Sequence, residues 1–502
     1  MRAPLRPLAP ALLLALALGC VKPAGSCTQT SDCAANEACD GGVCVRVPEL
    51  GGNGTGGGTL PGAYTPVTWS TLQGEPSATF QPDSIGADPT SGDVVVAGAF
   101  SEADFSPGGL PTGAFVERFQ GADGTPSATF LPVSFPTFSH GQFRTAVRTD
   151  GLVLFAATAF DPTTLGTLPI IVPQPQGSLV LGLLDATGAP VWAVTVDSTS
   201  AATTLVPVAV SARGTDLLVA GTGAGNFGCA TGPTAAATFV ALLSGVDGTC
   251  LWSRGLATRS VADVEPRDLG DVATGGVCAP TGAFFDPQGG TTCTSGLWVA
   301  ALSGADGSTV WATTGAGNVS VVRDLAVSPD GTVTAVGDAT GPVSFGGPTV
   351  DFGSFTGSFA VAFGPTGTPR APVRPVEAPY APKPDAASFV RCAADRLGRV
   401  WIAGRYQGQP TLLDTLFPAC RPPACAAATF LARLDGNGKV GSFLPLPIKP
   451  TADGRAYADD LVLCATTRTV AHALQLTGST TVGSAAWSST GVGDLGVIRI
   501  MP

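Results

Sequence analysis

Short apolar runs and glycine-containing polar turns alternate along most of this chain. Six apolar runs end in turns that align on a glycine: FVERFQGADG ending at Gly124, LVLGLLDATG at Gly188, FVALLSGVDG at Gly248, WVAALSGADG at Gly307, FAVAFGPTG at Gly367 and FLARLDGNG at Gly438. Four residues after three of these glycines stands a tryptophan: Trp192, Trp252 and Trp311. An apolar run followed by a polar, glycine-containing turn predicts a β-hairpin. The pattern therefore predicts a repeated pair of strands.

A second apolar pattern lies upstream of each of these turns. It is a short β-rich run that ends near a glycine: GDVVVAG at 92–98, GLVLFAA at 151–157, TDLLVAG at 215–221, GVCAPTG at 276–282, GTVTAVG at 331–337, GRVWIAG at 398–404 and a degenerate TVAHAL at 469–474. Still earlier strands, such as PVAVSA at 207–212 and RDLAVS at 323–328, precede these runs. One repeat thus holds four strands over roughly 60 to 70 residues. Seven such units predict an all-β fold, a seven-bladed β-propeller.

The two ends of the repeat region predict how the ring closes. The seventh unit ends at GVIRIMP, which corresponds to the third strand of a blade. The segment PVTWSTL at 66–72 resembles the fourth strands PVWAV at 190–194 and CLWSR at 250–254. Pairing this N-terminal strand with 496–501 would complete the last blade and remove exposed strand edges. We therefore expect an N-terminal strand to close the last blade.

These units resemble the bacterial seven-bladed beta-propeller repeats, whose blades carry an Asp-x-x-Gly-x-Val-Val-x-x-Gly strand pair and a later Phe-Val-x-x-Leu-x-x-x-Gly-x-x-x-Trp segment. The resemblance covers residues 66–502 and implies the fold, but this architecture hosts enzymes and binding scaffolds alike. The tryptophan-containing segment is also similar to quinoprotein repeats. Those repeats are nearer to 40 residues long, and the adjacent cysteine pair of the quinone enzymes is absent from this sequence. No cofactor is therefore expected.

The N-terminal residues have the features of an export signal. Arg2 and Arg6 precede an apolar run at 9–18, which is too short for a membrane-spanning helix. Residues 1–20 resemble a bacterial lipoprotein signal, in which a small residue precedes a cysteine that is lipidated. The resemblance implies that Cys20 is the site of lipid attachment and that the protein is exported and anchored to the bacterial outer membrane or cell surface. An ordinary cleaved secretion signal is the alternative.

A small cysteine-rich module is expected at 21–45. The segment CTQTSDCAANEACDGGVC contains Cys27, Cys33, Cys39 and Cys44. So short a segment cannot bury a useful apolar core, so two disulfides would have to stabilise it. Zinc binding is the alternative, although the CxxC pairs typical of structural zinc sites are missing. The spacing resembles small Cys modules found behind lipoprotein signals, and the glycine-rich stretch within 46–65 predicts a flexible linker to the propeller at 66–502.

The remaining cysteines also favour an oxidising compartment. Of the thirteen cysteines, twelve remain when Cys20 is set aside, an even number. Cys392 and Cys464 are predicted to pair because each ends the first strand of successive units, and Cys420 and Cys425 to close a small loop. The pairing of the other four propeller cysteines is ambiguous. Proximity pairs Cys229 with Cys250 and Cys278 with Cys293, whereas the predicted strand order puts Cys229 and Cys250 at opposite ends of one blade.

Charge and composition exclude some classes of partner. The net charge of -11 and the pI near 4.6 argue against binding to nucleic acid, which needs a clustered positive surface. Mean hydropathy is positive at +0.31, and no apolar run after residue 20 approaches the length of a membrane span. The apolar residues are therefore assigned to buried strands, and any membrane contact to the lipid anchor.

Residues for catalysis are scarce in the sequence. Only two histidines occur, His140 and His472, and His472 lies in a predicted strand, where a structural role is expected. A Ser-His-Asp arrangement through His140 stays open, but no GxSxG motif appears. The Asp residues of the GADG and DGNG turns are what tight hairpins need, and LDGNGK lacks the later Glu of a calcium loop. No metal site is predicted.

One polar pattern remains, on the strands expected to line the central channel. Four arginines stand seven or eight residues ahead of a glycine in their units: Arg144, Arg267, Arg323 and Arg391. Structural ion pairs at the channel mouth are one interpretation. The other is an anion-binding mouth for acidic sugars or carboxylates.

Two functions from different classes follow from these observations. The first is a lipid-anchored surface propeller that binds a protein or an acidic glycan, or acts as a scaffold. The alternative is a propeller hydrolase or lyase acting on extracellular glycans. Such an enzyme would need His, Tyr and acidic residues gathered on one face, and the whole chain has two His and four Tyr. We therefore favour the binding or scaffolding module.

Overall fold

The computed structural model describes two compact units, residues Met1–Gly56 and Gly57–Pro502. The described residues are 37–40, 43–46, 67–73, 79–101, 112–130, 143–160, 163–165, 168–172, 177–199, 204–229, 237–279, 282–283, 292–293, 296–345, 349–353, 357–370, 386–412, 415–417, 419–420, 425, 427–434, 440–450, 457–466, 470–489 and 493–500. In the first unit, β1 (Glu37–Asp40) pairs antiparallel with β2 (Val43–Arg46). The side chains of Cys27, Cys33, Cys39 and Cys44 lie outside the described residues, as does Cys20.

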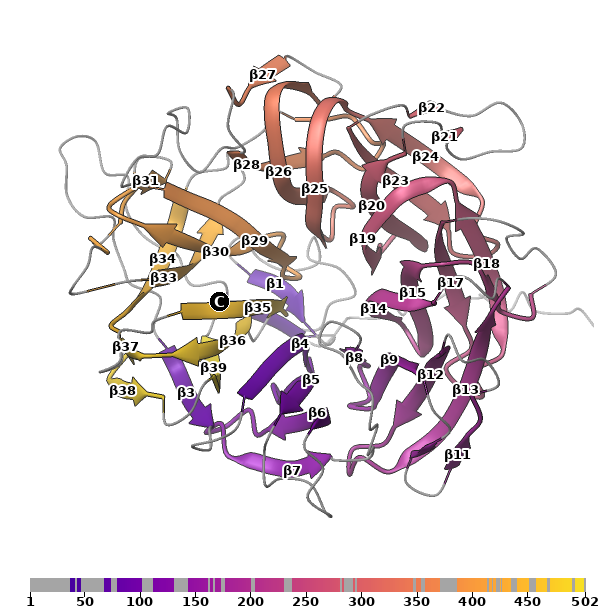
Figure 1. The fold of residues 1–502 in the computed structure, drawn as a ribbon, viewed down its shortest axis with the longest axis horizontal. Helices are drawn as coiled ribbons and strands as arrows, with labels where there is room; N and C mark the ends of the chain where they lie inside the picture. Colours follow the sequence, from indigo (N-terminus) through magenta and orange to yellow (C-terminus); the bar gives the residue numbers. More distant parts are fainter. Residues whose placement is uncertain are drawn as a thin grey trace, which may run out of the picture. The chain divides into compact units, whose positions relative to one another are not determined.

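The second unit is a ring of seven antiparallel blades, so the predicted seven-bladed β-propeller is confirmed (Figure 1). The strands of each blade are given from the axis outward. Blade 1 contains β4 (Thr79–Ala87), β5 (Val94–Ser101), β6 (Thr112–Phe119) and β7 (Pro126–Phe130), and blade 2 contains β8 (Phe143–Val147), β9 (Val153–Ala159), β12 (Ser178–Leu184) and β13 (Pro190–Ser198). Blade 3 contains β14 (Val206–Arg213), β15 (Asp216–Thr222), β17 (Thr238–Leu243) and β18 (Cys250–Leu256), and blade 4 contains β19 (Thr258–Pro266), β20 (Asp271–Cys278), β23 (Leu297–Ser303) and β24 (Thr309–Thr314). Blade 5 contains β25 (Ala316–Val327), β26 (Val333–Ser344) and β28 (Gly357–Phe363); blade 6 contains β29 (Ala386–Ala394), β30 (Val400–Gln407), β33 (Ala427–Leu434) and β34 (Val440–Ile448); blade 7 contains β35 (Tyr457–Ala465), β36 (Val470–Thr477), β39 (Asp494–Ile500) and β3 (Val67–Gln73).

The N-terminal strand closes the ring, as the sequence predicted. β3 is the outermost strand of blade 7, although the other three strands of that blade come from the C-terminal end of the chain. It pairs antiparallel with β39, with Val67 opposite Ile500 and Gln73 opposite Leu495. Trp69 in β3 is buried at 7% exposure. The two ends of the repeat region are therefore joined by backbone hydrogen bonds and by apolar packing.

A β-bulge recurs on the innermost strands and accounts for one of the repeated glycines. The pairing of the first and second strands shifts register at equivalent places in five blades: Pro82/Ser84, Pro207/Ala209, Val261/Asp263, Val322/Asp324 and Phe389/Arg391. In blade 4 the bulged strand approaches Gly276 so closely that a Cβ atom there would overlap the carbonyl oxygen of Ser260. The glycine at this place in the second strand therefore permits the bulge.

Hydrogen bonds join neighbouring blades at the turns between third and fourth strands. In blade 3, the Gly245 carbonyl accepts hydrogen bonds from Trp192 Nε1 and Arg148 Nη1 of blade 2, both at 3.1 Å. Two further turns repeat this arrangement: Gly304 with Trp252 and Arg213, and Gly121 with Trp69 and Arg499. In these three turns, the glycine three residues before the aligned glycine thus accepts a hydrogen bond from the repeated tryptophan of the preceding blade.

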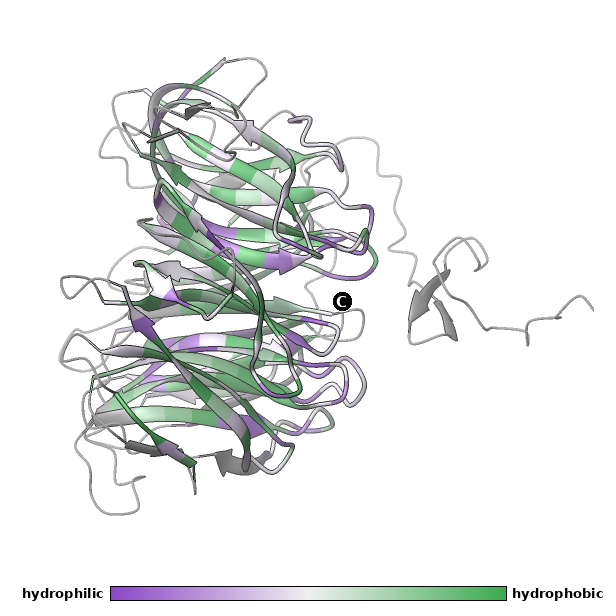
Figure 2. Ribbon diagram, turned by 90° about the vertical axis from the view of Figure 1, so that its right-hand side faces the viewer, coloured by the Kyte–Doolittle hydropathy of each residue, from purple (hydrophilic) through white to green (hydrophobic). Residues whose placement is uncertain are grey.

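The hydrophobic core is divided into clusters that span neighbouring blades. One cluster joins Val95 of blade 1 to Phe155 of blade 2, and another joins Phe80 of blade 1 to Val497 of blade 7. Figure 2 shows apolar colouring along the strands and polar colouring in hairpin turns at one face of the propeller. The alternation of apolar runs and polar turns in the sequence therefore corresponds to buried strands and exposed turns.

Longer connections between second and third strands carry small extra strands. These are β10 (Thr163–Leu165) with β11 (Leu168–Ile170), β21 (Gly282–Ala283) with β22 (Thr292–Cys293), β27 (Thr349–Asp351) against β26, β31 (Thr411–Leu412) with β32 (Thr415–Leu416), and β37 (Ser479–Val482) with β38 (Ala485–Ser488). β16 (Gly225–Asn226) pairs with β13 of the preceding blade. Within the described ranges, no helix has the length and apolar character needed to cross a membrane.

Candidate functional site

A cavity of about 920 Å³ lies on the propeller axis and is lined by the innermost strands of all seven blades. These strands are β4, β8, β14, β19, β25, β29 and β35. The lining extends to the turns that follow several of them, including Pro89, Gly214, Asp268 and Arg396. Because every wall is a strand paired within its own blade, the backbone of the cavity is fixed by the fold.

Two predicted arginines, Arg144 and Arg391, line this cavity from opposite parts of the chain. They occupy equivalent places on β8 and β29, four residues before the turn that follows each strand. Arg144 Nε donates to the carbonyl of Val208 at 2.7 Å, and its Nη1 donates to the carbonyl of Phe143 at 2.9 Å. Arg391 Nη1 lies 3.3 Å from the carbonyls of Arg323 and Val390. These bonds hold each guanidinium group and, within the part of the chain that the structure describes, use only some of its five N–H donors.

The two guanidinium groups are close enough to affect each other. Burial lowers the pKa of Arg144, the carboxylate of Asp83 opposes that shift, and the positive charge of Arg391 adds to it. The Arg144 Nη1 atom lies 3.9 Å from Asp83 Oδ1, and the Arg144 side chain is 18% exposed. Like charges that line one cavity repel each other, and an anion bound near both would relieve that repulsion. The arrangement can therefore bind a compact anionic group.

Carboxyl groups line the same cavity. Asp263 Oδ1 accepts a hydrogen bond from the Val264 amide at 2.8 Å, and Asp324 Oδ2 accepts one from the Cys392 amide at 2.9 Å. On the neighbouring strand β14, Ser211 Oγ donates to Glu265 Oε2 at 3.0 Å. Each of the last two bonds joins innermost strands of adjacent blades. These carboxyl groups therefore link the blades as well as lining the cavity.

Burial changes the protonation of these carboxyl groups. It raises the pKa of Asp324 to about 6 and that of Glu265 to about 7. The pKa of Asp263 is raised well above its ordinary value, first by burial and then by the negative charges of Glu265 and Asp324. Carboxyl groups with raised pKa values in a cavity are typical of functional sites. The sequence pattern of arginines with accompanying aspartates includes Asp324, but it missed Asp263 and Glu265, because the glycine spacing that it follows does not mark their positions.

The other two predicted arginines have structural partners instead. Arg267 is 3% exposed, forms an ion pair of 2.5 Å with Asp271 and donates to the carbonyl of Pro365 in blade 5 at 2.7 Å. Arg323 Nη2 lies 2.5 Å from Asp338 Oδ2. Both residues also line the cavity, so their ion pairs fit the first interpretation of the arginine pattern, but they do not share the structural position of Arg144 and Arg391.

Turn and bulge geometry explains this difference. Arg267 stands eight residues before Gly275, but Gly275 lies inside β20, and the turn after β19 ends at Gly270. Arg323 occupies the extra residue of a bulge, between Val322 and Asp324. Only Arg144 and Arg391 stand at the same distance from their turns, so only these two share a position.

The predicted disulfide between Cys392 and Cys464 does not form, because both are free thiols. Cys392 packs in the core shared by blades 5 and 6, where its Sγ atom lies 3.8 Å from the Thr334 carbonyl. Cys464 packs against the cluster shared by blades 7 and 1. The prediction failed because the two thiols belong to different blade interfaces. Burial raises the pKa of Cys464 to about 12, so this thiol stays protonated.

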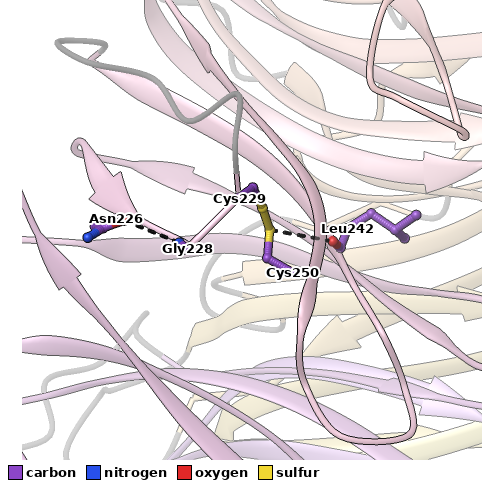
Figure 3. The surroundings of a disulfide bond; sticks show 5 residues. All are labelled: Asn226, Gly228, Cys229, Leu242 and Cys250. Carbon is purple, nitrogen blue, oxygen red and sulfur yellow. Dashed lines mark hydrogen bonds between the residues drawn. A yellow bond between two sulfur atoms is a disulfide. The ribbon is translucent and has the colours of Figure 1, made fainter.

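Disulfide bonds tie down two of the longer connections. Cys420 and Cys425 form a disulfide, the pair expected to close a small loop. Cys229 is bonded to Cys250 (Figure 3), although the strand order had placed them at opposite ends of their blade. The connection after β15 brings them together, because its β16 segment runs along β13 of blade 2 before reaching Cys229. Cys278 is also disulfide-bonded, and the Cys293 side chain lies outside the described residues.

The histidines do not form a catalytic group with the cavity in the part of the chain that the structure describes. His472 is fully buried in β36, its Nδ1 lies 2.9 Å from the Val462 carbonyl, and burial lowers its pKa to about 4. It is therefore a neutral structural histidine at physiological pH. His140 lies outside the described residues. Among the side chains described, no three His, Cys, Asp or Glu residues are grouped so that they could hold a metal ion.

The raised pKa values predict how stability depends on pH. The folded state holds protons on Glu265 and Asp324 up to about pH 7 and 6, whereas the unfolded chain loses them near pH 4. This contribution to stability is therefore present at low pH and is lost as the pH rises through the folded-state values. We expect the melting temperature to fall between pH 5 and pH 8, and Glu265→Gln to weaken that fall. Thermal denaturation followed by circular dichroism tests this.

The matched control is Asp123→Asn, because Asp123 is an exposed carboxyl in a turn of blade 1. Its pKa is lowered by hydrogen bonds from Thr125, so it does not titrate between pH 5 and pH 8. A pH profile that is the same for Glu265→Gln, Asp123→Asn and the unaltered chain would contradict the assignment.

This chain has low-identity similarity to several solved structures. No protein-family model matches the sequence, and no curated protein matches it significantly. Among solved structures it is similar to BamB from Moraxella catarrhalis, with 13% identity, 86% of this chain and 100% of that chain covered, and a TM-score of 0.36. It is also similar to the Pan2 WD40 domain of Neurospora crassa, with 10% identity, 88% of this chain and 98% of that chain covered, and a TM-score of 0.41. A third similar structure is the β-propeller domain of the Trilobed protease from Pyrococcus furiosus, with 9% identity, 81% of this chain and 96% of that chain covered, and a TM-score of 0.41.

Proposed function

We propose that this chain is an exported, lipid-anchored propeller that binds an acidic ligand in its central cavity. In this proposal residues 1–20 are the signal peptide and Cys20 carries the lipid. Residues 21–45 form the cysteine-rich module, 46–65 the linker and 66–502 the propeller. The protein acts as a binding or scaffolding module at the bacterial outer membrane or cell surface.

The single observation that carries the proposal is the pair Arg144 and Arg391 in a cavity of about 920 Å³. The volume falls within the range of ordinary ligand sites, roughly 300 to 1,000 Å³. Both guanidinium groups are oriented by backbone carbonyls of their own or neighbouring blades. A compact dianion could accept hydrogen bonds from both groups at once, which suits arginine because its donors form a fixed fork. The ligand class supported is therefore a small carboxylate or an acidic group of a larger molecule.

Replacing either arginine should weaken the binding of a small dianion such as succinate. We expect Arg144→Gln and Arg391→Gln each to weaken binding by ~1 to 3 kcal/mol, the range for hydrogen bonds to charged groups. The effect should shrink as salt is added, because salt screens the remaining attraction. Isothermal titration calorimetry at pH 6 provides the measurement.

The control is Arg259→Gln, because Arg259 is exposed on β19, the strand that supplies Asp263 and Glu265. It should leave succinate binding unchanged. Binding that is unaffected by the changes at Arg144 and Arg391, or equally weakened by the change at Arg259, would contradict the proposed site.

The anchor is tested separately from the ligand. We expect the unaltered chain, expressed in a bacterial host with labelled fatty acid, to incorporate label and to partition with membranes. Cys20→Ala should abolish both, because the lipid is attached through the thiol of Cys20. Cys464→Ala is a suitable control because this free thiol is buried in the propeller. Label retained by the Cys20→Ala variant would overturn the anchor.

A further inference from the structure

We infer that the central cavity takes up protons together with its anionic ligand, so that binding is tight at mildly acidic pH and weak at alkaline pH. The inference rests on the proposed function, because it concerns the same cavity and the same two arginines. It adds the condition under which the ligand is captured and released.

The first observation is a pair of carboxyl groups from two neighbouring blades. Asp263 on β19 and Asp324 on β25 both line the cavity, and the charge of Asp324 raises the pKa of Asp263. Two neighbouring carboxyl groups do not readily ionise together, so the pair keeps one proton to a higher pH than an isolated carboxyl group does. Asp263 accepts a hydrogen bond from the Val264 amide, and Asp324 accepts one from the Cys392 amide. The pair is thus held in place by backbone donors while its proton can still leave.

The second observation is that this pair lies beside one of the proposed ligand-binding groups. Cys392, whose amide donates to Asp324, directly follows Arg391 in β29. The positive charge of Arg391 lowers the pKa of Asp324. A carboxylate near Arg391 and an incoming anion compete for the attraction of the same guanidinium group. Protonation of the pair therefore removes a negative charge that opposes the ligand.

The charges facing the cavity from every innermost strand support the same conclusion. Among the described side chains, the titratable or charged groups on these strands are Asp83 on β4, Arg144 on β8, Asp263 and Glu265 on β19, Arg323 and Asp324 on β25, Arg391 and Cys392 on β29, and Cys464 on β35. Arg267, Asp268 and Arg396 line the cavity from the turns that follow β19 and β29. On β14, Ser211 faces Glu265 and Arg213 stands at the strand end. The side chains of β35 before Leu461 lie outside the described residues.

The balance of these charges explains why an anion needs protons. Arg323 is paired with Asp338 and Arg267 with Asp271, burial raises the pKa of both thiols, and Arg213, Asp268 and Arg396 stand at a strand end or in the turns. Among the other described side chains of these strands, two arginines face four carboxyl groups, those of Asp83, Asp263, Glu265 and Asp324. With all four ionised, the centre is negative and repels an anion. Protons on Glu265 and on the aspartate pair bring it to neutrality.

The experiment uses a probe whose own charge does not change with pH. 1,2-Ethanedisulfonate stays a dianion between pH 5 and pH 8, so any pH dependence of its binding belongs to the protein. We expect its dissociation constant to be about tenfold smaller at pH 5.5 than at pH 8. Calorimetry in two buffers with different ionisation enthalpies should show uptake of about one proton per bound anion near pH 6.5.

Two variants locate the protons. Asp324→Asn and Glu265→Gln each remove a titrating group and keep an oxygen that can accept the same hydrogen bond. Each should reduce the proton uptake and improve binding at pH 8, whereas the exposed control Asp123→Asn should change neither. Having two variants keeps the test decisive if one of them fails to fold.

The outcomes separate this inference from the proposed function. Anion binding that depends on Arg144 and Arg391, but with one dissociation constant from pH 5.5 to pH 8 and no proton uptake, overturns the inference and leaves the proposed function standing. Proton uptake that is unchanged in both acidic-residue variants also overturns it. No binding of 1,2-ethanedisulfonate or succinate at any pH overturns both.

Discussion

A chain that begins at Thr79 will melt at least about 5 °C below one that begins at Gly57, because the shorter chain lacks the outermost strand of blade 7. β3 contributes backbone pairing along β39 from Val67 to Gln73 and buries Trp69 against blade 1. Losing the Trp69 side chain alone should cost about 3 to 5 kcal/mol. For a propeller of this length, ~1 kcal/mol corresponds to about 1 °C.

Removing β3 also exposes the edge of β39. An unpaired strand edge can pair with another chain, so we expect the shorter chain to aggregate on heating. Trp69→Ala in the chain that begins at Gly57 separates the loss of side-chain packing from the loss of the strand, and it should melt between the other two. Circular dichroism and light scattering during heating provide the measurements. Equal melting temperatures for the chains beginning at Gly57 and Thr79 would contradict closure by this strand.

The repeat pattern predicted the fold because each repeated residue type performs a local task. The turn glycines, the apolar runs and the tryptophan four residues later all recur at one spacing, and this spacing is set by the geometry of a blade. The pairing of the N-terminal strand with β39 followed from the same spacing, since the last repeat stops after its third strand. Backbone periodicity is therefore readable from the sequence.

The cavity could be predicted only in part, because side-chain direction depends on bulges that residue spacing does not reveal. One extra residue puts Arg323 against Asp338 while Asp324, the next residue, bonds to blade 6. Likewise, Cys392 and Cys464 stand near the ends of equivalent strands but face different blade interfaces. The pairing of Cys229 with Cys250 depended on the path of a long connection, which carries no periodic signal.

Gly307→Ala will destabilise the propeller more than Gly214→Ala, although both glycines have a positive φ. The φ angles are 70° at Gly307 and 62° at Gly214, a region that costs an alanine roughly 1 to 2 kcal/mol. At Gly214 an added Cβ would meet nothing within 4 Å, so this cost is the whole effect. At Gly307 the Cβ would lie 2.7 Å from Cε3 of Trp252, which must then move. Overpacking of this kind adds about 1 to 3 kcal/mol.

The displacement of Trp252 has a second consequence, because its Nε1 donates to the Gly304 carbonyl at 3.1 Å and so joins blade 3 to blade 4. We therefore expect melting to fall by about 2 to 5 °C for Gly307→Ala and by about 1 to 2 °C for Gly214→Ala. A double-mutant cycle identifies the cause: in a Trp252→Phe background the smaller ring leaves room for the Cβ, so Gly307→Ala should cost little more than Gly214→Ala. Additive effects of Gly307→Ala and Trp252→Phe would show that the glycine is required only for its backbone conformation and not for the contact between blades.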